Sequence, residues 1–153
     1  MTSALPPRSY DELEQYLPYL VNRLASLGQV RQNRMLQESG ITLVTLRALS
    51  ILHIEEGLTI NEIAARAFTE QSSTSRAIDA MVSQGLVERR TPEHDQRRRE
   101  VVLTEMGRER LLGAWPAMDR YFDTIIQGIT PAERDMCRSI IQRMLANLDN
   151  IAS

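Results

Sequence analysis

The 153-residue sequence contains no lysine, so all 18 of its basic residues are arginine. It has one cysteine, Cys137, which excludes a disulfide within the chain and any multi-cysteine zinc or iron–sulfur site. The two histidines, His53 and His94, are too few for a histidine-rich metal site. No apolar run approaches the ~20 residues that cross a bilayer, and no secretory signal precedes the first polar segment. We therefore expect a cytoplasmic globular protein that needs no metal or other cofactor.

Catalytic motifs are also missing. The sequence has no glycine-rich phosphate loop, no serine nucleophile motif and no metal-ligand spacing, and its two histidines lie far apart. These absences argue against an enzyme. Apolar residues make up 42% of the chain, which at this length is enough to bury a hydrophobic core.

Charge is concentrated in one stretch of the chain. The net charge is −2, which by itself does not favour a polyanionic partner. Between Arg89 and Arg99, however, five arginines and two acidic residues give a local charge of +3. The planar guanidinium group suits phosphate and guanine edges, although the missing lysine is equally well explained by codon usage.

Helix start signals recur along the sequence. Capping boxes are present at residues 9–12, 59–62 and 130–133, and Thr42 and Thr104 are further N-cap candidates. Pro18 predicts a kink or a restart of the first helix. A heptad seam follows the first capping box, and a similar seam follows the last one: Leu13, Leu17, Leu20, Leu24 and Leu27, then Cys137, Ile141, Met144, Leu148 and Ile151.

A β-hairpin interrupts the helical pattern. Residues 86–91 and 99–103 are extended runs separated by a polar loop that contains Pro92. Two short helices, beginning near Thr59 and Thr69, precede this hairpin. The order predicts a mainly α fold with a small β-hairpin wing, that is, a winged helix–turn–helix domain flanked by N- and C-terminal dimerisation helices.

The second helix of such a unit enters the major groove of DNA with its N-terminal side chains. The candidates here are all polar and able to contact bases or phosphates: Gln71, Ser72, Ser73, Thr74, Ser75 and Arg76. Alternatively, the serines and the threonine only cap the helix and stay solvated. The wing adds three arginines that suit the negative potential of a narrow minor groove: Arg97, Arg98 and Arg99. Asp95 can pair with one of these arginines and hold the loop in shape.

The two apolar seams lie at opposite ends of the sequence. A homodimer can use both of them, because terminal helices can interlock across a two-fold axis. Alternatively, both seams are core stripes within one subunit. Cys137 falls on the second seam, where we expect it to pack as a small, unreactive apolar residue.

Several motifs resemble those of the MarR family of bacterial transcriptional regulators. The segments concerned are Gly85–Arg90, Asp95–Arg98 and Val102–Gly107, and the helix motifs at Leu58–Ala64 and Thr74–Asp79 are similar to those of the family. The family hallmark is an Asp-x-Arg wing followed by Leu-Thr-x-x-Gly. Two departures are Thr74, where valine is common, and Phe68, which is bulky for the turn.

The resemblance implies a homodimer that binds double-stranded, pseudo-palindromic DNA near promoters, usually as a repressor released by a small, often aromatic, acid. By matching position, Arg97 is expected to reach the minor groove, with Asp95 as its structural partner. The expected division is residues 1–40 and 105–153 for dimerisation and residues 41–104 for DNA binding. Aromatic and cationic residues are available for an effector pocket near the dimer helices: Tyr19, Arg23, Arg47, His53 and Trp115. The alternative function is a helical, dimeric interaction module whose hairpin binds protein.

Overall fold

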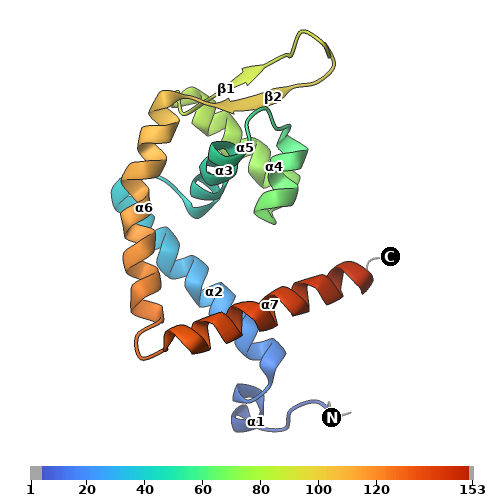
Figure 1. The fold of residues 1–153 in the computed structure, drawn as a ribbon, viewed down its shortest axis with the longest axis vertical. Helices are drawn as coiled ribbons and strands as arrows, with labels where there is room; N and C mark the ends of the chain where they lie inside the picture. Colours follow the sequence, from blue (N-terminus) through green and yellow to red (C-terminus); the bar gives the residue numbers. More distant parts are fainter. Residues whose placement is uncertain (1–4, 152–153) are drawn as a thin grey trace. The chain divides into compact units, whose positions relative to one another are not determined.

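A computed structural model describes residues 5–151 and divides into two compact units, with the division between Met118 and Asp119. The predicted functional division at residues 40 and 104 stays a prediction. The elements of the described chain, in order, are α1 Tyr10–Glu14, α2 Leu17–Leu36, the 3-10 helix η1 Gln37–Ser39, α3 Leu43–Ile54, α4 Ile60–Ala67, α5 Gln71–Ser83, β1 Val87–Arg90, β2 Glu100–Leu103, α6 Glu105–Ile125 and α7 Pro131–Ile151. The predicted fold class is confirmed: helices with one small hairpin (Figure 1).

Five helices begin at the N-caps that the sequence predicts: Ser9, Thr42, Thr59, Thr104 and Thr130. Helix α5 begins instead after Glu70, which makes no side-chain cap hydrogen bond. The hydroxyl of Thr42 accepts a hydrogen bond from the backbone of Thr45 at 3.2 Å, and so opens α3. The helix restarts as α2, with Pro18 in the first turn of α2. Proline suits that position because it has no N–H to donate and its φ is fixed near the helical value. Of the two outcomes predicted at Pro18, a kink or a restart, the structure shows the restart, with two helices, α1 and α2.

The core of the first unit lies between α3, α4, α5 and the hairpin, which together form one lobe. Its fully buried side chains are contributed by each of these elements and by the segments that join them: Leu49, Leu52, Ile63, Ile78, Met81, Leu86 and Val101. Figure 1 shows the hairpin leaving this lobe beside α5, with the loop between its strands at the far end. Burial of the apolar side of the lobe therefore fixes which side of α5 stays exposed.

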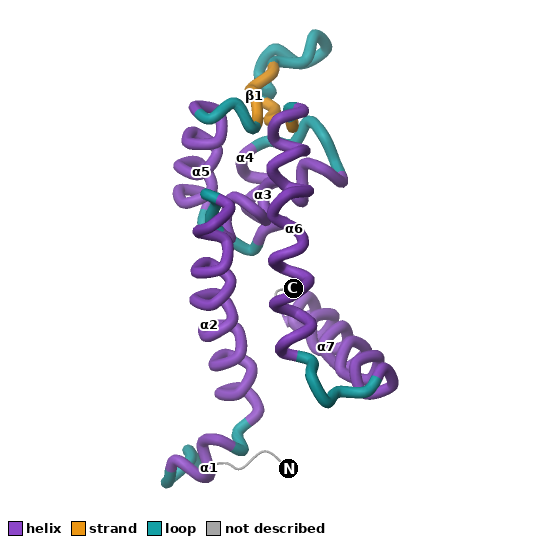
Figure 2. The backbone as a smooth tube through the Cα atoms, turned by 90° about the vertical axis from the view of Figure 1, so that its left-hand side faces the viewer, coloured by secondary structure: helices purple, strands orange, loops and turns teal. Residues whose placement is uncertain are grey.

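The hairpin is a two-stranded antiparallel ladder. Its register pairs Val87 with Leu103 and Arg90 with Glu100, and an isolated bridge adds Leu58 opposite Val101. That bridge, with a 2.8 Å hydrogen bond from the Val101 N–H to the Leu58 carbonyl, ties the hairpin to the segment just before α4. Figure 2 shows the long loop that follows β1 and extends beyond the strands.

The Thr-x-x-Gly segment at the start of α6 locks that helix to the hairpin. The Thr104 hydroxyl lies 2.7 Å from the Gly85 carbonyl oxygen and accepts a 3.0 Å hydrogen bond from the Gly107 N–H. A Cβ at Gly107 would lie 2.0 Å from the carbonyl oxygen of Leu86, well inside van der Waals contact. Only glycine permits this close approach, so the motif is a packing requirement.

The two predicted seams are exposed in the single chain. In α2, Leu24 is 64% exposed and the buried residues are Gly28 and Leu36, which contradicts the reading of this seam as a core stripe. In α7, Ile141 and Leu148 are at least half exposed, whereas the side chain of Ile151 lies outside the described residues. Cys137, on the α7 seam, is likewise exposed in the single chain, so it does not pack within one subunit; its packing in a dimer stays a prediction.

Candidate nucleic-acid interface

The turn between α4 and α5 has an unusual conformation. Phe68 ends α4 with φ 52° and ψ 47°, and among the described residues it is the one non-glycine with positive φ. A side chain in this left-handed region costs roughly 1 kcal/mol or more relative to glycine. The backbone N–H of Thr69 donates to the Ala64 carbonyl at 3.1 Å, so the turn is closed in the manner of a helix C-cap.

Thr74 faces the inside of the lobe. It is 1% exposed, and its hydroxyl lies 2.8 Å from the Thr69 hydroxyl and 3.2 Å from the Glu70 carbonyl oxygen. The prediction that Thr74 contacts DNA is therefore wrong for this structure. The residue stands in the first turns of α5 on the side that packs against the core, and its hydroxyl stabilises the turn.

The other predicted residues of α5 lie on its outer side. Gln71, Ser72 and Ser73 are exposed, and their side chains carry no hydrogen bond or ion pair to the rest of the described chain. Ser75 is half-buried, and the exposed Arg76 donates a 3.3 Å hydrogen bond to the Ser72 carbonyl. The exposed N-terminal turn of α5 can thus present an amide, two hydroxyls and a guanidinium to a groove.

The wing loop holds its shape through its own backbone. The Asp95 carboxylate accepts a 3.0 Å hydrogen bond from the Arg97 N–H, and the Arg98 N–H donates to the Asp95 carbonyl at 3.2 Å. Asp95 was expected to pair with an arginine side chain, but its partner is the Arg97 backbone. The Arg97 side chain is exposed and has no hydrogen bond or ion pair within the described residues.

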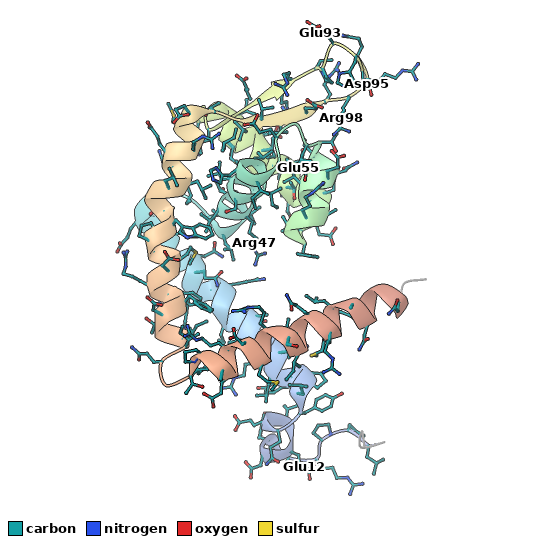
Figure 3. The ribbon with its side chains drawn as sticks, viewed as in Figure 1. Glu12, Arg47, Glu55, Glu93, Asp95 and Arg98 are labelled. Atoms are coloured by element: carbon teal, nitrogen blue, oxygen red, sulfur yellow. The ribbon has the colours of Figure 1, made fainter. Side chains whose placement is uncertain are left out.

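Arg98 points back toward the lobe (Figure 3) and joins three separate segments. Its guanidinium donates to Glu62 at 2.8 Å, to Glu100 at 2.9 Å and to the Gly57 carbonyl at 3.1 Å. Glu100 is 8% exposed, and both acids raise the pKa of the Arg98 guanidinium. The Nε donor of Arg98 binds Glu100 and its Nη2 donor fastens the wing to α4, while its side chain stays 32% exposed, so the contact of Arg98 with DNA stays a prediction.

The contacts of Arg98 with Glu62, Glu100 and Gly57 form a wing anchor, and two other arginines of the hairpin make contacts of their own. Arg99 is exposed and donates to the Gln96 carbonyl at 2.8 Å, which uses part of its guanidinium to brace the loop. Arg89 on β1 forms an ion pair with Asp79 on the outer side of α5. Sequence reasoning missed the pairing of Arg89 with Asp79, although both residues lie in segments that it had singled out.

The anchor also makes the stability of the lobe depend on pH. The backbone N–H and the hydroxyl of Thr59, followed by Arg98, hold the pKa of the Glu62 carboxyl below its ordinary value of 4.5. Ionised Glu62 therefore stabilises the fold above about pH 4.5, and this contribution is lost as the pH falls through the lowered folded-state value. We expect Glu62→Gln to lower the melting temperature at neutral pH and to differ less from the wild type in acid.

Glu133 provides a matched control for this prediction. Its pKa is lowered by the Thr130 hydroxyl and backbone in the same capping geometry, and its carboxylate contacts no arginine in the described chain. Glu133→Gln should share the pH dependence, measured by thermal unfolding. Only Glu62→Gln should speed amide hydrogen exchange in residues 92–99. Equal exchange in both variants would contradict the anchoring role.

The predicted effector residues do not form one group. Arg23 lies 5.9 Å from the centre of the Tyr19 ring and forms a 3.0 Å ion pair with Glu14. His53 Nδ1 lies 2.9 Å from an Arg108 nitrogen. Arg47 is half-buried on α3, and Figure 3 shows it at the end of the lobe away from the wing. Trp115 is 47% exposed on α6.

Two of the hollows between described residues of the first unit have linings that contain none of the predicted effector residues. One, of about 370 Å³, lies between η1 and α6 beside Arg110 and Gly113. The other, of about 600 Å³, lies at the base of the wing beside Gly57 and Arg90. No group of histidine, cysteine or acidic residues in the described chain is arranged to hold a metal ion, and none of its helices is long and apolar enough to span a membrane.

Helix α5, here called the reading helix, has an exposed polar N-terminal turn, and it follows α4, to which Arg98 fastens a basic hairpin. This combination defines a winged helix–turn–helix DNA-binding protein. The model of the MarR family matches residues 39–98, which cover the helix–turn–helix and most of the wing. The chain belongs to the MarR family of transcriptional regulators.

Relatives match well beyond that segment. A MarR-family regulator from Silicibacter pomeroyi is 38% identical, with a TM-score of 0.77 over 88% of this chain and 91% of its own. A second from Silicibacter pomeroyi DSS is 30% identical, with a TM-score of 0.81 over 94% and 97%. The transcriptional repressor MprA of Escherichia coli (strain K12) is 26% identical over 142 residues, which are 89% of this chain and 81% of the repressor.

Proposed function

We propose that this chain is a homodimeric repressor that binds a pseudo-palindromic operator. In each subunit, the exposed N-terminal turn of α5 reads the major groove and Arg97 enters the adjacent minor groove. The observation that carries the proposal is a charged side chain, Arg97, that has no partner in the described chain and sits on a loop with fixed backbone. The repressor class is supported by the relative MprA, whose name describes a repressor.

The dimer is proposed from the two exposed seams. Large apolar side chains cover one side of α2 and of α7, and exposed patches of this kind mark interaction sites in proteins that stay in solution. A two-fold dimer uses the same patch on both subunits and places two copies of α5 about one helical turn of DNA apart. We accordingly assign residues 1–40 and 105–153 to dimerisation and residues 41–104 to DNA binding.

We further propose that a small aromatic acid releases the DNA. Tyr19 and Arg23 already form a cation–ring pair, the kind of arrangement that can hold a carboxylate attached to a ring. Arg47, His53 and Trp115 remain proposed effector residues, but they do not form one group with this pair in the single chain, so the proposal rests on Tyr19 and Arg23. Isothermal titration with salicylate as the probe tests the assignment: Arg23→Ala should reduce binding, and unchanged binding would remove Arg23 from the pocket.

The DNA-binding proposal is tested by the salt dependence of affinity. Arginine–phosphate contacts release counterions, so the logarithm of the association constant should fall linearly with the logarithm of salt concentration. The duplexes are one selected by the protein from a randomised pool and one of shuffled sequence. We expect the selected duplex to bind at least about a thousandfold more tightly than the shuffled one. Equal, weak binding to both would favour the alternative of a protein-interaction module.

A further inference from the structure

Phe68 is the most exposed large apolar side chain of the DNA-binding lobe. It is 88% exposed, although the neighbouring residues Ala67 and Thr69 are buried and half-buried. Its ring is not used by the core, and its backbone is held in the left-handed region that phenylalanine rarely adopts. The fold therefore gains nothing visible from a ring at this position, and glycine would suit the backbone better.

The backbone around Phe68 is fixed from both sides. The Phe68 N–H donates to the Ala65 carbonyl at 3.3 Å, and the next residue, Thr69, is joined to Thr74 by the 2.8 Å contact between their hydroxyls. These contacts tie the end of α4 to the second turn of α5. The ring is thus presented on a stiff turn, and little conformational freedom would be lost when it binds.

Phe68 is also close to the N-terminus of the reading helix. Gln71 is three positions further along the chain, so the two Cα atoms lie within about 11 Å of each other, less than the roughly 12 Å width of the major groove. The side chains of Gln71 and Ser72 are exposed in the same region of the chain. When these side chains lie on base edges, the Phe68 ring is therefore close enough to reach the edge of the same groove.

Apolar contact with the 5-methyl group of thymine is one of the few ways in which a side chain without polar atoms reads a base. We propose that Phe68 contacts a thymine methyl group at the edge of each half-site, and that it is a specificity-determining residue of this regulator. The proposal rests on the function proposed above, since it requires α5 to lie in the major groove.

The test compares thymine with deoxyuridine, which differs only by the missing methyl group. The duplex is the one that the wild-type protein selects from a randomised pool, and each thymine is replaced in turn. At one position in each half-site, deoxyuridine should weaken wild-type binding about threefold to fourfold, the effect expected for one buried methyl group. Phe68→Ala should weaken binding to the unmodified duplex about tenfold and should be insensitive to deoxyuridine at that position.

Two further variants keep the result interpretable. Phe68→Asn places a residue that tolerates positive φ in the turn, so it removes the ring with less strain; it should bind like Phe68→Ala. Ile54→Ala removes another apolar side chain, 85% exposed, from the end of α3 and should leave binding unchanged. Thermal unfolding should show that the Phe68 variants are at least as stable as the wild type.

The outcomes separate failure of the inference from failure of the proposed function. If the wild type selects no duplex, the DNA-binding function itself fails. If it selects one, but Phe68→Ala binds equally well or keeps its response to deoxyuridine at every thymine, the inference about Phe68 is overturned. A loss of dimer in sedimentation of Phe68→Ala would place the ring against the second subunit and would also overturn it.

Discussion

Replacing Arg97 with alanine is expected to weaken operator binding more than tenfold, that is, by about 1.4 kcal/mol or more. The side chain is exposed on a loop whose backbone is fixed by Asp95, and it has no partner within the described chain. A narrow minor groove concentrates negative potential, so the guanidinium should find its partner there. Fluorescence anisotropy with the selected duplex measures the loss, and sedimentation should show that the oligomeric state is unchanged.

Arg120→Ala is the charge-matched control for Arg97→Ala. Arg120 is an exposed arginine on α6, outside the hairpin and α5, so its loss should change affinity little. The slope of affinity against salt should decrease by about one for Arg97→Ala, because one phosphate-facing charge is removed. If both variants bind as tightly as the wild type, the wing has no part in DNA binding.

The second large effect is expected from charges placed on the α2 seam. Leu24 and Leu27 are 64% and 51% exposed in the single chain, and in the proposed dimer they are buried against the second subunit. Glutamate at both positions would have to lose its hydration there without a partner. We expect Leu24→Glu/Leu27→Glu to raise the dimer dissociation constant at least a hundredfold, about 2.7 kcal/mol, measured by analytical ultracentrifugation.

Operator binding should be lost together with the dimer, since two linked lobes are needed to engage both half-sites. Ile54→Glu introduces the same charge at an exposed apolar position of the DNA-binding lobe and should leave the dimer intact. A monomeric double variant that still binds the complete operator tightly would show that the seams have another purpose. A dimer that survives both charges would place the interface elsewhere.

Elements with local signals could be predicted from the sequence. Thr59 and Glu62 form the capping box that starts α4, and the capping box of Thr130 and Glu133 precedes α7. The hairpin follows from its extended runs, because β-branched residues and a proline-containing loop leave few other conformations. Pro18 is compatible with a kink or a restart, and the structure shows the restart, since proline fits the first turn of a new helix.

The contacts of the site could be predicted less completely. Arg97 and Arg98 are adjacent and chemically identical, yet Arg98 meets the Gly57 carbonyl, 41 residues away, and Glu62, 36 residues away. No local pattern states which of two arginines turns inward. The burial of Thr74 could not be predicted for a similar reason. It lies in a polar stretch of helix, but its hydroxyl contacts the Thr69 hydroxyl across the turn.

Phe68 shows the opposite case, in which a departure from a pattern carried information. The sequence indicated that its side chain is bulky for the turn, but it could not show where the ring goes. The left-handed backbone and the outward-facing ring are visible only once α4 and α5 are packed. A residue that conflicts with its local backbone is therefore a place to look for function.

The anchoring of Arg98 has a consequence for how the protein could respond to a signal. One guanidinium fastens the hairpin to both Glu62 and the Gly57 carbonyl, so the wing, α4 and the segment before α4 are joined by charge-assisted hydrogen bonds. A ligand that bends the hairpin alone would have to break several charge-assisted hydrogen bonds. Rotating an entire lobe relative to its twin breaks none of them. In the proposed repressor, we therefore expect release from DNA to move the wing together with α4 instead of bending the hairpin alone.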